Sequence, residues 1–153
     1  MSNLDNLGNV LIRSDLNVPI KNGEITDYFR ILKSVGVIEK IFDKSRTITF
    51  TSHMGRPEGK DLNLSLRPVA KSMENILGKK VHFIDEVFGE EVEEQIEKSE
   101  FKIFLLENLR FEKGEIGNDN NFSKQVTKPF NSYIFDAFGA AHREHASLVS
   151  FGE

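Results

Sequence analysis

The feature that most constrains the fold is an alternation of short apolar runs with longer amphipathic segments. Five apolar runs have the composition of β-strands, and they span residues 9–15, 47–52, 80–85, 102–108 and 132–138. Between them, segments 28–42, 66–77, 90–98 and 121–128 carry the spacing of helices. Alternating strands and helices are typical of repeated βαβ units. The sequence therefore predicts one α/β domain over residues 1–153, with helices on both faces of a parallel sheet of about five strands.

Local signals support the helices. Asp27 can cap the helix predicted from residue 28, and Pro68 with Gly78 marks the start and end of the helix over 66–77. The acidic run EEVEEQIEKSE is most simply a solvated helix face rather than a catalytic carboxylate pair.

Composition excludes several classes of protein. At 153 residues, with 39% hydrophobic and 29% charged residues, the chain suits one soluble globular domain. A net charge of −4 argues against a nucleic-acid partner. The absence of cysteine excludes disulfides and thiolate metal sites. Neither a signal peptide nor an apolar stretch long enough to span a membrane is recognisable. We therefore expect a cytoplasmic protein without a membrane partner.

The stretch TSHMGRPEGKD, residues 51–61, superficially resembles a nucleotide phosphate loop. That motif requires four residues between its glycines and a hydroxyl residue after its lysine. Here three residues separate Gly55 from Gly59, and Lys60 is followed by Asp61. What remains is His53 and Arg56, two possible cationic donors beside a glycine, or else a plain surface turn.

Basic side chains follow most of the predicted strands at the point where each strand ends. Because the carboxyl ends of parallel strands meet at one edge, where open α/β sheets bind ligands, we expect these side chains to lie together. The third strand differs, since it ends in Asp85 and Glu86. Arg30 can join the group from the start of the first helix. The set is Asp15 and Asn17 after the first strand, His53 and Arg56 after the second, Arg110 after the fourth, and His142 and Arg143 after the fifth.

This set of side chains favours a small, multiply charged anion as the ligand. Arginine pairs bidentately with phosphate or carboxylate and stays charged at physiological pH. Asp15 and Asn17 instead suit a ligand hydroxyl, which needs an acceptor and a donor. A hydroxylated, phosphorylated acid would use all of these groups. The alternative is that Asp15 pairs with a neighbouring arginine and merely closes a loop.

Two other patterns have simpler interpretations. His142 and His145 are three residues apart, but no third ligand is spaced to complete a metal site, so no metal is predicted. The 13 phenylalanines are expected to lie in the core.

Six segments, taken in order, resemble the amino-terminal domain of phosphoglycerate kinase. They are NVLIRSDLNVP, ITDYFRI, TSHMGRPEGK, SLRPVAKSM, LLENLRF and DAFGAAHREHAS, and together they extend over nearly the whole chain. The resemblance implies a Rossmann-like three-layer α/β/α domain with strand order 3-4-2-1-5.

The resemblance also implies a function. Phosphoglycerate kinase exchanges phosphate between ATP and 3-phosphoglycerate, forming ADP and 1,3-bisphosphoglycerate, with Mg²⁺, in glycolysis. Its amino-terminal domain binds 3-phosphoglycerate, and a separate carboxyl-terminal domain, expected to be absent from these 153 residues, binds the nucleotide. We therefore expect neither ATP nor Mg²⁺ to bind this chain, and no catalysis by the chain alone.

Roles carry over by position. Asp15 and Asn17 correspond to contacts with the hydroxyl-bearing end of the substrate, and Arg30 to the catalytic arginine near its carboxylate. The cluster around the 3-phosphate corresponds to His53, Arg56, Arg110 and Arg143. The full implied substrate-binding set is Asp15, Leu16, Asn17, Arg30, His53, Met54, Gly55, Arg56, Arg110 and Arg143.

Two alternatives to an enzyme fragment remain open. The chain is either a non-catalytic module that binds 3-phosphoglycerate or a similar acid, or a structural fragment whose site is too disordered to bind. In the family a sixth strand pairs beside residues 132–138, so the domain is expected to be incomplete there. The apolar fifth strand and the tail to residue 153 are then expected to self-associate.

Overall fold

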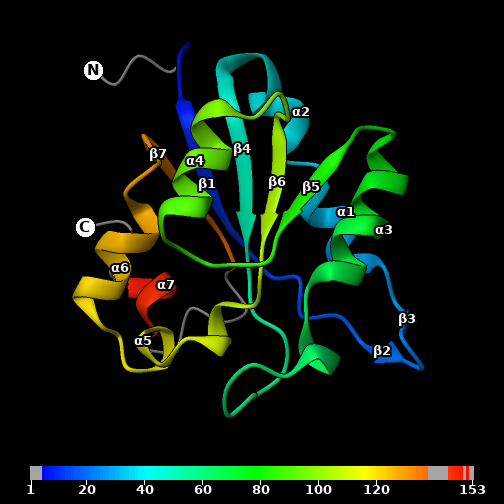
Figure 1. Cartoon of the computed structure of the whole chain (residues 1–153). Coiled ribbons are helices and arrows are strands. Elements are labelled where there is room, and N and C mark those ends of the chain that lie inside the picture. Colours follow the sequence, from blue (N-terminus) through cyan, green and yellow to red (C-terminus); the bar gives the residue numbers. More distant parts are fainter. Residues whose placement is uncertain (1–4, 138–144, 150, 152–153) are drawn as a thin grey trace.

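A computed structural model describes residues 5–137, 145–149 and 151 of the chain. The central sheet has five strands: β1 (Gly8–Ser14), β4 (Ser45–Thr51), β5 (Val81–Ile84), β6 (Ile103–Leu106) and β7 (Ser132–Asp136). Their order is β5-β6-β4-β1-β7, and every neighbouring pair is parallel (Figure 1). Numbered along the chain, this is 3-4-2-1-5, so the predicted fold class and strand order are confirmed.

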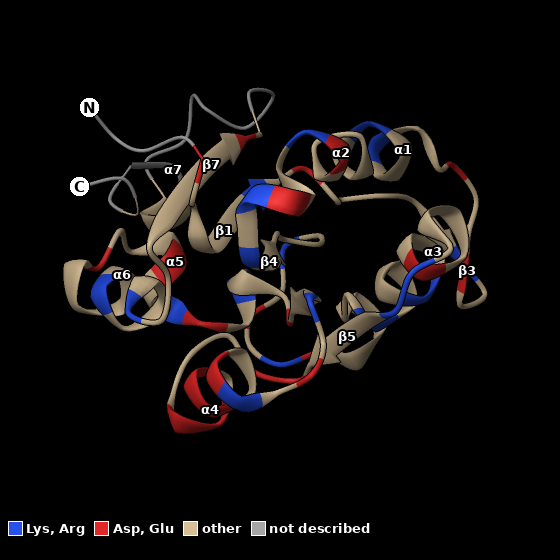
Figure 2. Cartoon of the chain, turned by 90° about the horizontal axis from the view of Figure 1, so that it is seen from above, with Lys and Arg blue, Asp and Glu red and all other residues tan. Residues whose placement is uncertain are grey.

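Helices cover both faces of the sheet and give the predicted three layers (Figures 1 and 2). One face carries α1 (Phe29–Val35), α2 (Ile38–Ile41) and α3 (Arg67–Leu77). The other carries α4 (Glu90–Lys98), α6 (Asn120–Thr127) and α7 (Ala146–Val149), with α5 (Lys113–Ile116) beside α6 and α7. Alternation along β1 feeds both cores, since Val10 and Ile12 pack into one and Leu11 into the other.

The helix ends follow the sequence signals closely. α3 has Pro68 in its first turn and stops at Gly78, whose φ of 63° lies in the left-handed region. α4 has the predicted bounds, with Val92 and Ile96 buried and its acidic residues on the outer side (Figure 2). α6 is capped by Asp119, whose carboxylate accepts hydrogen bonds from two backbone N–H groups of the first turn.

The single helix predicted over 28–42 is wrong in one respect, because it is broken in the middle. α1 ends at Val35, α2 begins at Ile38, and a short 3-10 turn, η1 (Phe42–Lys44), follows. Around the break the backbone N–H of Val37 bonds to the carbonyl of Ser34, three residues back. Gly36 lies at this point, and glycine is a weak helix former. The predicted cap is displaced by one residue, since the N-cap of α1 is Tyr28, but Asp27 still accepts from the N–H of Phe29, the first residue of α1, at 2.9 Å.

Several short elements have no counterpart among the predictions. A hairpin of β2 (Ile20–Lys21) and β3 (Glu24–Ile25) leaves the body of the sheet after β1. Two 3-10 turns, η2 (Leu62–Leu64) and η3 (Leu109–Phe111), follow β4 and β6. Within the part of the chain that the structure describes, no helix has the length and apolar character needed to cross a membrane.

Candidate functional site

The carboxyl ends of the parallel strands meet at one edge of the sheet, toward which the arrowheads of β4 and β6 point in Figure 1. β1, β4 and β6 end at Ser14, Thr51 and Leu106. The loops after these three strands are joined directly by hydrogen bonds. The structure therefore brings together the predicted residues of the first, second and fourth predicted strands.

The loop after β1 is tied to the loop after β4 at two points. The backbone N–H of Leu16 donates to Ser52 Oγ at 2.9 Å. The N–H of Gly55 donates to Asn17 Oδ1 at 3.1 Å. Asn17 therefore fixes the position of residues 53–56 as well as its own loop.

Asn108, which follows β6, pins the same segment from the other side. Its Oδ1 accepts from the N–H of Met54 at 3.1 Å and from the N–H of Arg110 at 3.0 Å. Its Nδ2 donates to the carbonyls of Met54, at 2.8 Å, and Leu64, at 2.9 Å. Asn108 is fully buried, and three of the four bonds are buried as well, the bond to Leu64 being partly buried.

These contacts decide how residues 51–61 can hold an anion. In a phosphate loop the backbone N–H groups point at the ligand. Here the N–H groups of Met54 and Gly55 already donate to Asn108 and Asn17. The loop therefore lacks two of the N–H donors that a nucleotide phosphate loop would direct at its ligand, and anion binding by the side chains of His53 and Arg56 stays a prediction.

Gly55 is required by this geometry. Its φ of +62° lies in the left-handed region, and a Cβ at this position would meet Leu64 Cδ2 at 2.9 Å. Its carbonyl accepts from Arg110 Nη1 at 2.6 Å, which turns the guanidinium toward the segment 53–56. The side chain of Arg56 is exposed at the same loop.

Arg30, the predicted catalytic residue, lies in the first turn of α1 and faces the loop after β1. Its Nη1 is 3.4 Å from Asp15 Oδ1 and also donates to the carbonyl of Asn17. The ion pair is the arrangement that the loop-closing alternative requires. The side chain is nevertheless 48% exposed, and it lines a hollow of about 550 Å³ together with Asn17, Val18, Pro19, Asp27 and Phe29.

Two predicted residues, His142 and Arg143, lie outside the described residues, so the contribution of the fifth strand to the site stays a prediction. The same holds for Phe138, which was counted in that strand.

Sequence reasoning missed Arg13, which lies inside β1 and is fully buried. Its Nη2 is 2.7 Å from His53 Nδ1, and its Nε donates to Ser147 Oγ at 2.8 Å. Ser147 in turn bonds to the buried carboxylate of Glu115 through its hydroxyl and its N–H. Burial lowers the pKa of Arg13, and the charge of Glu115 opposes that shift. An arginine within a strand buried on both faces was the signal for such a partner.

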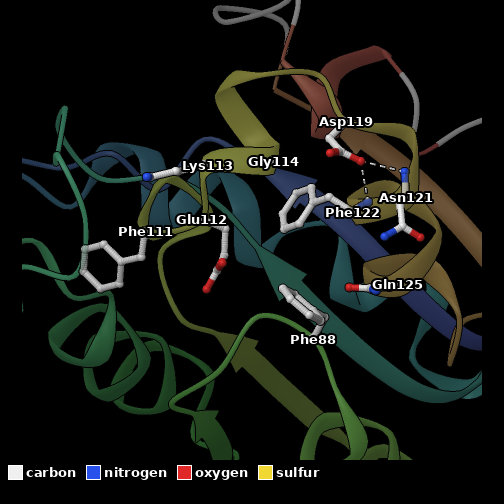
Figure 3. A pocket seen from close by; sticks show the side chains of 9 residues that line it. All are labelled: Phe88, Phe111, Glu112, Lys113, Gly114, Asp119, Asn121, Phe122 and Gln125. Carbon is white, nitrogen blue, oxygen red and sulfur yellow. Dashed lines mark hydrogen bonds between the residues drawn. The ribbon is translucent and has the colours of Figure 1, made fainter.

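A second hollow, of about 400 Å³, lies apart from this cluster beside α5 and α6 (Figure 3). Phe88 and Phe122 meet edge to face in it, with ring centroids 5.8 Å apart. Its Asp119 is engaged as the cap of α6, and Glu112 adds a second carboxylate. With two carboxylates against one cation, that of Lys113, this hollow is a poor site for an anion.

Comparison with known proteins agrees with the fold and the sequence motifs. The family described as phosphoglycerate kinase matches residues 3–153. Phosphoglycerate kinase of Wolbachia pipientis subsp. Culex pipiens is 47% identical over 146 residues, which are 95% of this chain and 37% of that protein. The enzyme of Dictyoglomus turgidum is 46% identical over 145 residues, covering 94% of this chain and 37% of its own length.

Solved structures give the same result. Phosphoglycerate kinase from Pyrococcus horikoshii superposes with a TM-score of 0.83 at 30% identity, over 97% of this chain and 38% of that one. The structure from Coxiella burnetii gives 0.77 at 38% identity, over 95% and 36%. The chain thus spans a little over a third of the length of these relatives. With the family match, the sequence identity and the shared fold in agreement, this chain belongs to the phosphoglycerate kinase family.

Proposed function

We propose that this chain is the 3-phosphoglycerate-binding part of a phosphoglycerate kinase and forms a single domain over residues 1–153. The observation that carries the proposal is the cross-linked edge of the sheet, where loops from three strands gather Asn17, His53 and Arg110. In the intact enzyme the reaction would move the γ-phosphoryl group of ATP to a carboxylate oxygen of 3-phosphoglycerate, in the cytoplasm as part of glycolysis.

In this proposal the side chains divide by the chemistry of the substrate. His53, Arg56 and Arg110, joined by Arg143, surround the 3-phosphate, because its oxygens accept charge-assisted hydrogen bonds. Asp15 and Asn17 bind the hydroxyl-bearing end. Leu16, Met54 and Gly55 shape the site through backbone that is already hydrogen-bonded within the protein.

Arg30 is the proposed catalytic residue. For this role its guanidinium turns from Asp15 toward the substrate carboxylate, and its partly exposed side chain leaves room for that movement. There it neutralises charge that develops on the transferred phosphoryl group, the main contribution a protein makes in this reaction class. Mg²⁺ would shield the phosphates of the nucleotide in the intact enzyme. The loop 51–61 is not suited to cradle those phosphates, since the N–H groups of Met54 and Gly55 are engaged.

Calorimetric titration with 3-phosphoglycerate tests the binding role. We expect weak binding that weakens further as salt rises, because charged contacts carry the affinity. Arg56→Ala and Arg110→Ala should each cost about 1.5–3 kcal/mol, the scale of a charged hydrogen bond. Arg46→Ala is the matched control, because Arg46 lies at the opposite end of β4 and bonds to the carbonyls of Ile96 and Glu97. Unchanged affinity in both site variants would place the ligand elsewhere.

A coupled assay with ATP, Mg²⁺ and 3-phosphoglycerate tests the catalytic part. A polypeptide of these 153 residues should give only background turnover, because phosphoryl transfer needs both substrates held in line. Turnover that scales with protein concentration and survives repurification would contradict this expectation.

The second candidate function is a binding module that catalyses nothing. In this second candidate the residues that span 36–38% of the solved relatives supply a binding site alone, without the nucleotide-binding half of the reaction. The DNA downstream of the codon for residue 153 separates the two candidates, because an enzyme gene would continue with a nucleotide-binding domain.

A further inference from the structure

The buried arginine in β1 suggests a role that rests on the proposed function and extends it. We propose that Arg13 is a positioning residue that fixes His53 as the tautomer with its proton on Nε2, so that the ring presents an N–H donor to the anion. Arg13 itself does not contact the ligand in this scheme.

The side chains of Arg13 and His53 are in direct contact. Arg13 Nη2 lies 2.7 Å from His53 Nδ1, within the range of a strong hydrogen bond. A guanidinium has only donors, so Nδ1 must be the acceptor. A neutral imidazole that accepts through one nitrogen carries its proton on the other. Phosphate oxygens only accept at this contact, so the Nε2–H tautomer is the one a neutral His53 needs for a phosphate group.

Burial and hydrogen bonds hold the side chain of Arg13 in place. Arg13 is 0% exposed, unlike the exposed Arg56, and this burial prevents direct contact with a ligand. Its Nη1 donates to the carbonyl of Ser14 at 2.5 Å, and its Nε to Ser147 Oγ at 2.8 Å. With Nη2 directed at His53, each nitrogen of the guanidinium has an assigned partner within the protein.

The buried charge of Arg13 is compensated by the carboxylate of Glu115. Glu115 is also 0% exposed, and its carboxylate accepts from the N–H of Ser147 at 2.9 Å and from the Ser147 hydroxyl. Because Ser147 Oγ accepts from Arg13 and donates to Glu115, the serine links the two buried charges. This compensation keeps the guanidinium protonated and hence a donor toward His53.

The first measurement is made on the unsubstituted chain, and a substitution is needed only to assign its signals. Two-bond ¹H–¹⁵N correlation spectra of the ¹⁵N-labelled chain, recorded above neutral pH without ligand, report which ring nitrogen of each histidine carries the proton. His53→Ala identifies the His53 signals among those of the four histidines. We expect His53 to be almost entirely the Nε2–H tautomer. A predominant Nδ1–H tautomer, or an unbiased mixture, would overturn the proposal.

The second measurement is a double-mutant cycle between Arg13→Met and His53→Ala, read as affinity for 3-phosphoglycerate. Glu115 is left unchanged, because it compensates the charge of Arg13 in the reference state, and the cost of removing its partner is common to both arms of the cycle and cancels. Arg13→Met should weaken binding about tenfold when His53 is present and less than about twofold when it is absent. Equal effects in both backgrounds would show that Arg13 acts independently of His53 and refute the positioning role.

The two measurements separate this inference from the proposed function. If the unsubstituted chain fails to bind 3-phosphoglycerate, the proposed function fails, while the tautomer of His53 still decides the role of Arg13. Arg13→Lys provides the conservative variant, and it should restore part of the tautomer bias lost in Arg13→Met because it retains a donor.

Discussion

Replacing Asn108 with alanine should both destabilise the protein and loosen the site. The side chain makes four hydrogen bonds, two to Met54 and one each to Leu64 and Arg110, and all but the bond to Leu64 are fully buried. At a net contribution of about 1 kcal/mol each, their loss should lower the free energy of unfolding by about 4 kcal/mol. This is a large share of the stability of a small domain, which is about 5–15 kcal/mol in total.

Urea denaturation at fixed temperature measures the change, and amide hydrogen exchange locates it. The N–H of Met54 should lose protection in Asn108→Ala, since its acceptor is removed. Asn63→Ala is the matched control, because Asn63 is exposed, and it should change stability by less than about 0.5 kcal/mol. A loss below about 1.5 kcal/mol for Asn108→Ala, or unchanged protection of Met54, would refute the idea that this side chain pins the loop.

Three further outcomes are expected. Gly55→Ala should lower the free energy of unfolding, measured by urea denaturation, by about 1–3 kcal/mol because of the positive φ and the contact with Leu64. Gly36→Ala, in right-handed helical backbone, should be neutral or stabilising, and similar effects of the two substitutions would contradict the strain argument. Burial raises the pKa of Tyr133 above 10.0, so the native state keeps a proton that the unfolded chain loses. The free energy of unfolding should therefore fall as pH rises above about 10, and it should fall less steeply in Tyr133→Phe. Equal slopes in the two proteins would exclude this group as the cause. β7 is an edge strand, so light scattering should show self-association through residues 132–153 at high concentration, and a monomer in which β7 amides are as protected as those of β1 would disprove it.

The strands of the sheet were predicted well because each has a clear local sequence signal. Each is a short apolar run between turn residues, whereas the order of the strands in the sheet was implied by the family resemblance and not by any local signal. α4 was placed to the residue by its helical spacing, which puts its acidic residues on a solvated face and Val92 and Ile96 on the buried one. The two-residue strands of the hairpin were missed because they are too short to show any period.

The site was predictable as a set of strand ends but not as a network. The rule for parallel sheets placed Asp15, Asn17, His53 and Arg110 at one edge without knowledge of any contact. It gave no account of Asn108, which had been assigned to the end of a strand, or of Arg13. The partner of Arg13 Nε, Ser147, is 134 residues away along the chain, and no local pattern connects positions that far apart.

That separation has a consequence for the order in which the protein takes shape during synthesis. β1 leaves the ribosome before the other strands of the sheet, yet it lies between β4 and β7 and is completed by residues made much later. Until residue 147 has emerged, the guanidinium of Arg13 lacks the serine that links it to Glu115, and closing β1 over it would bury a charge without compensation. The high sequence separation of these contacts favours slow, late consolidation of the domain over gradual growth from its amino-terminal end. Nascent chains halted before this point should therefore remain sensitive to protease at β1, although every residue of that strand has already been made.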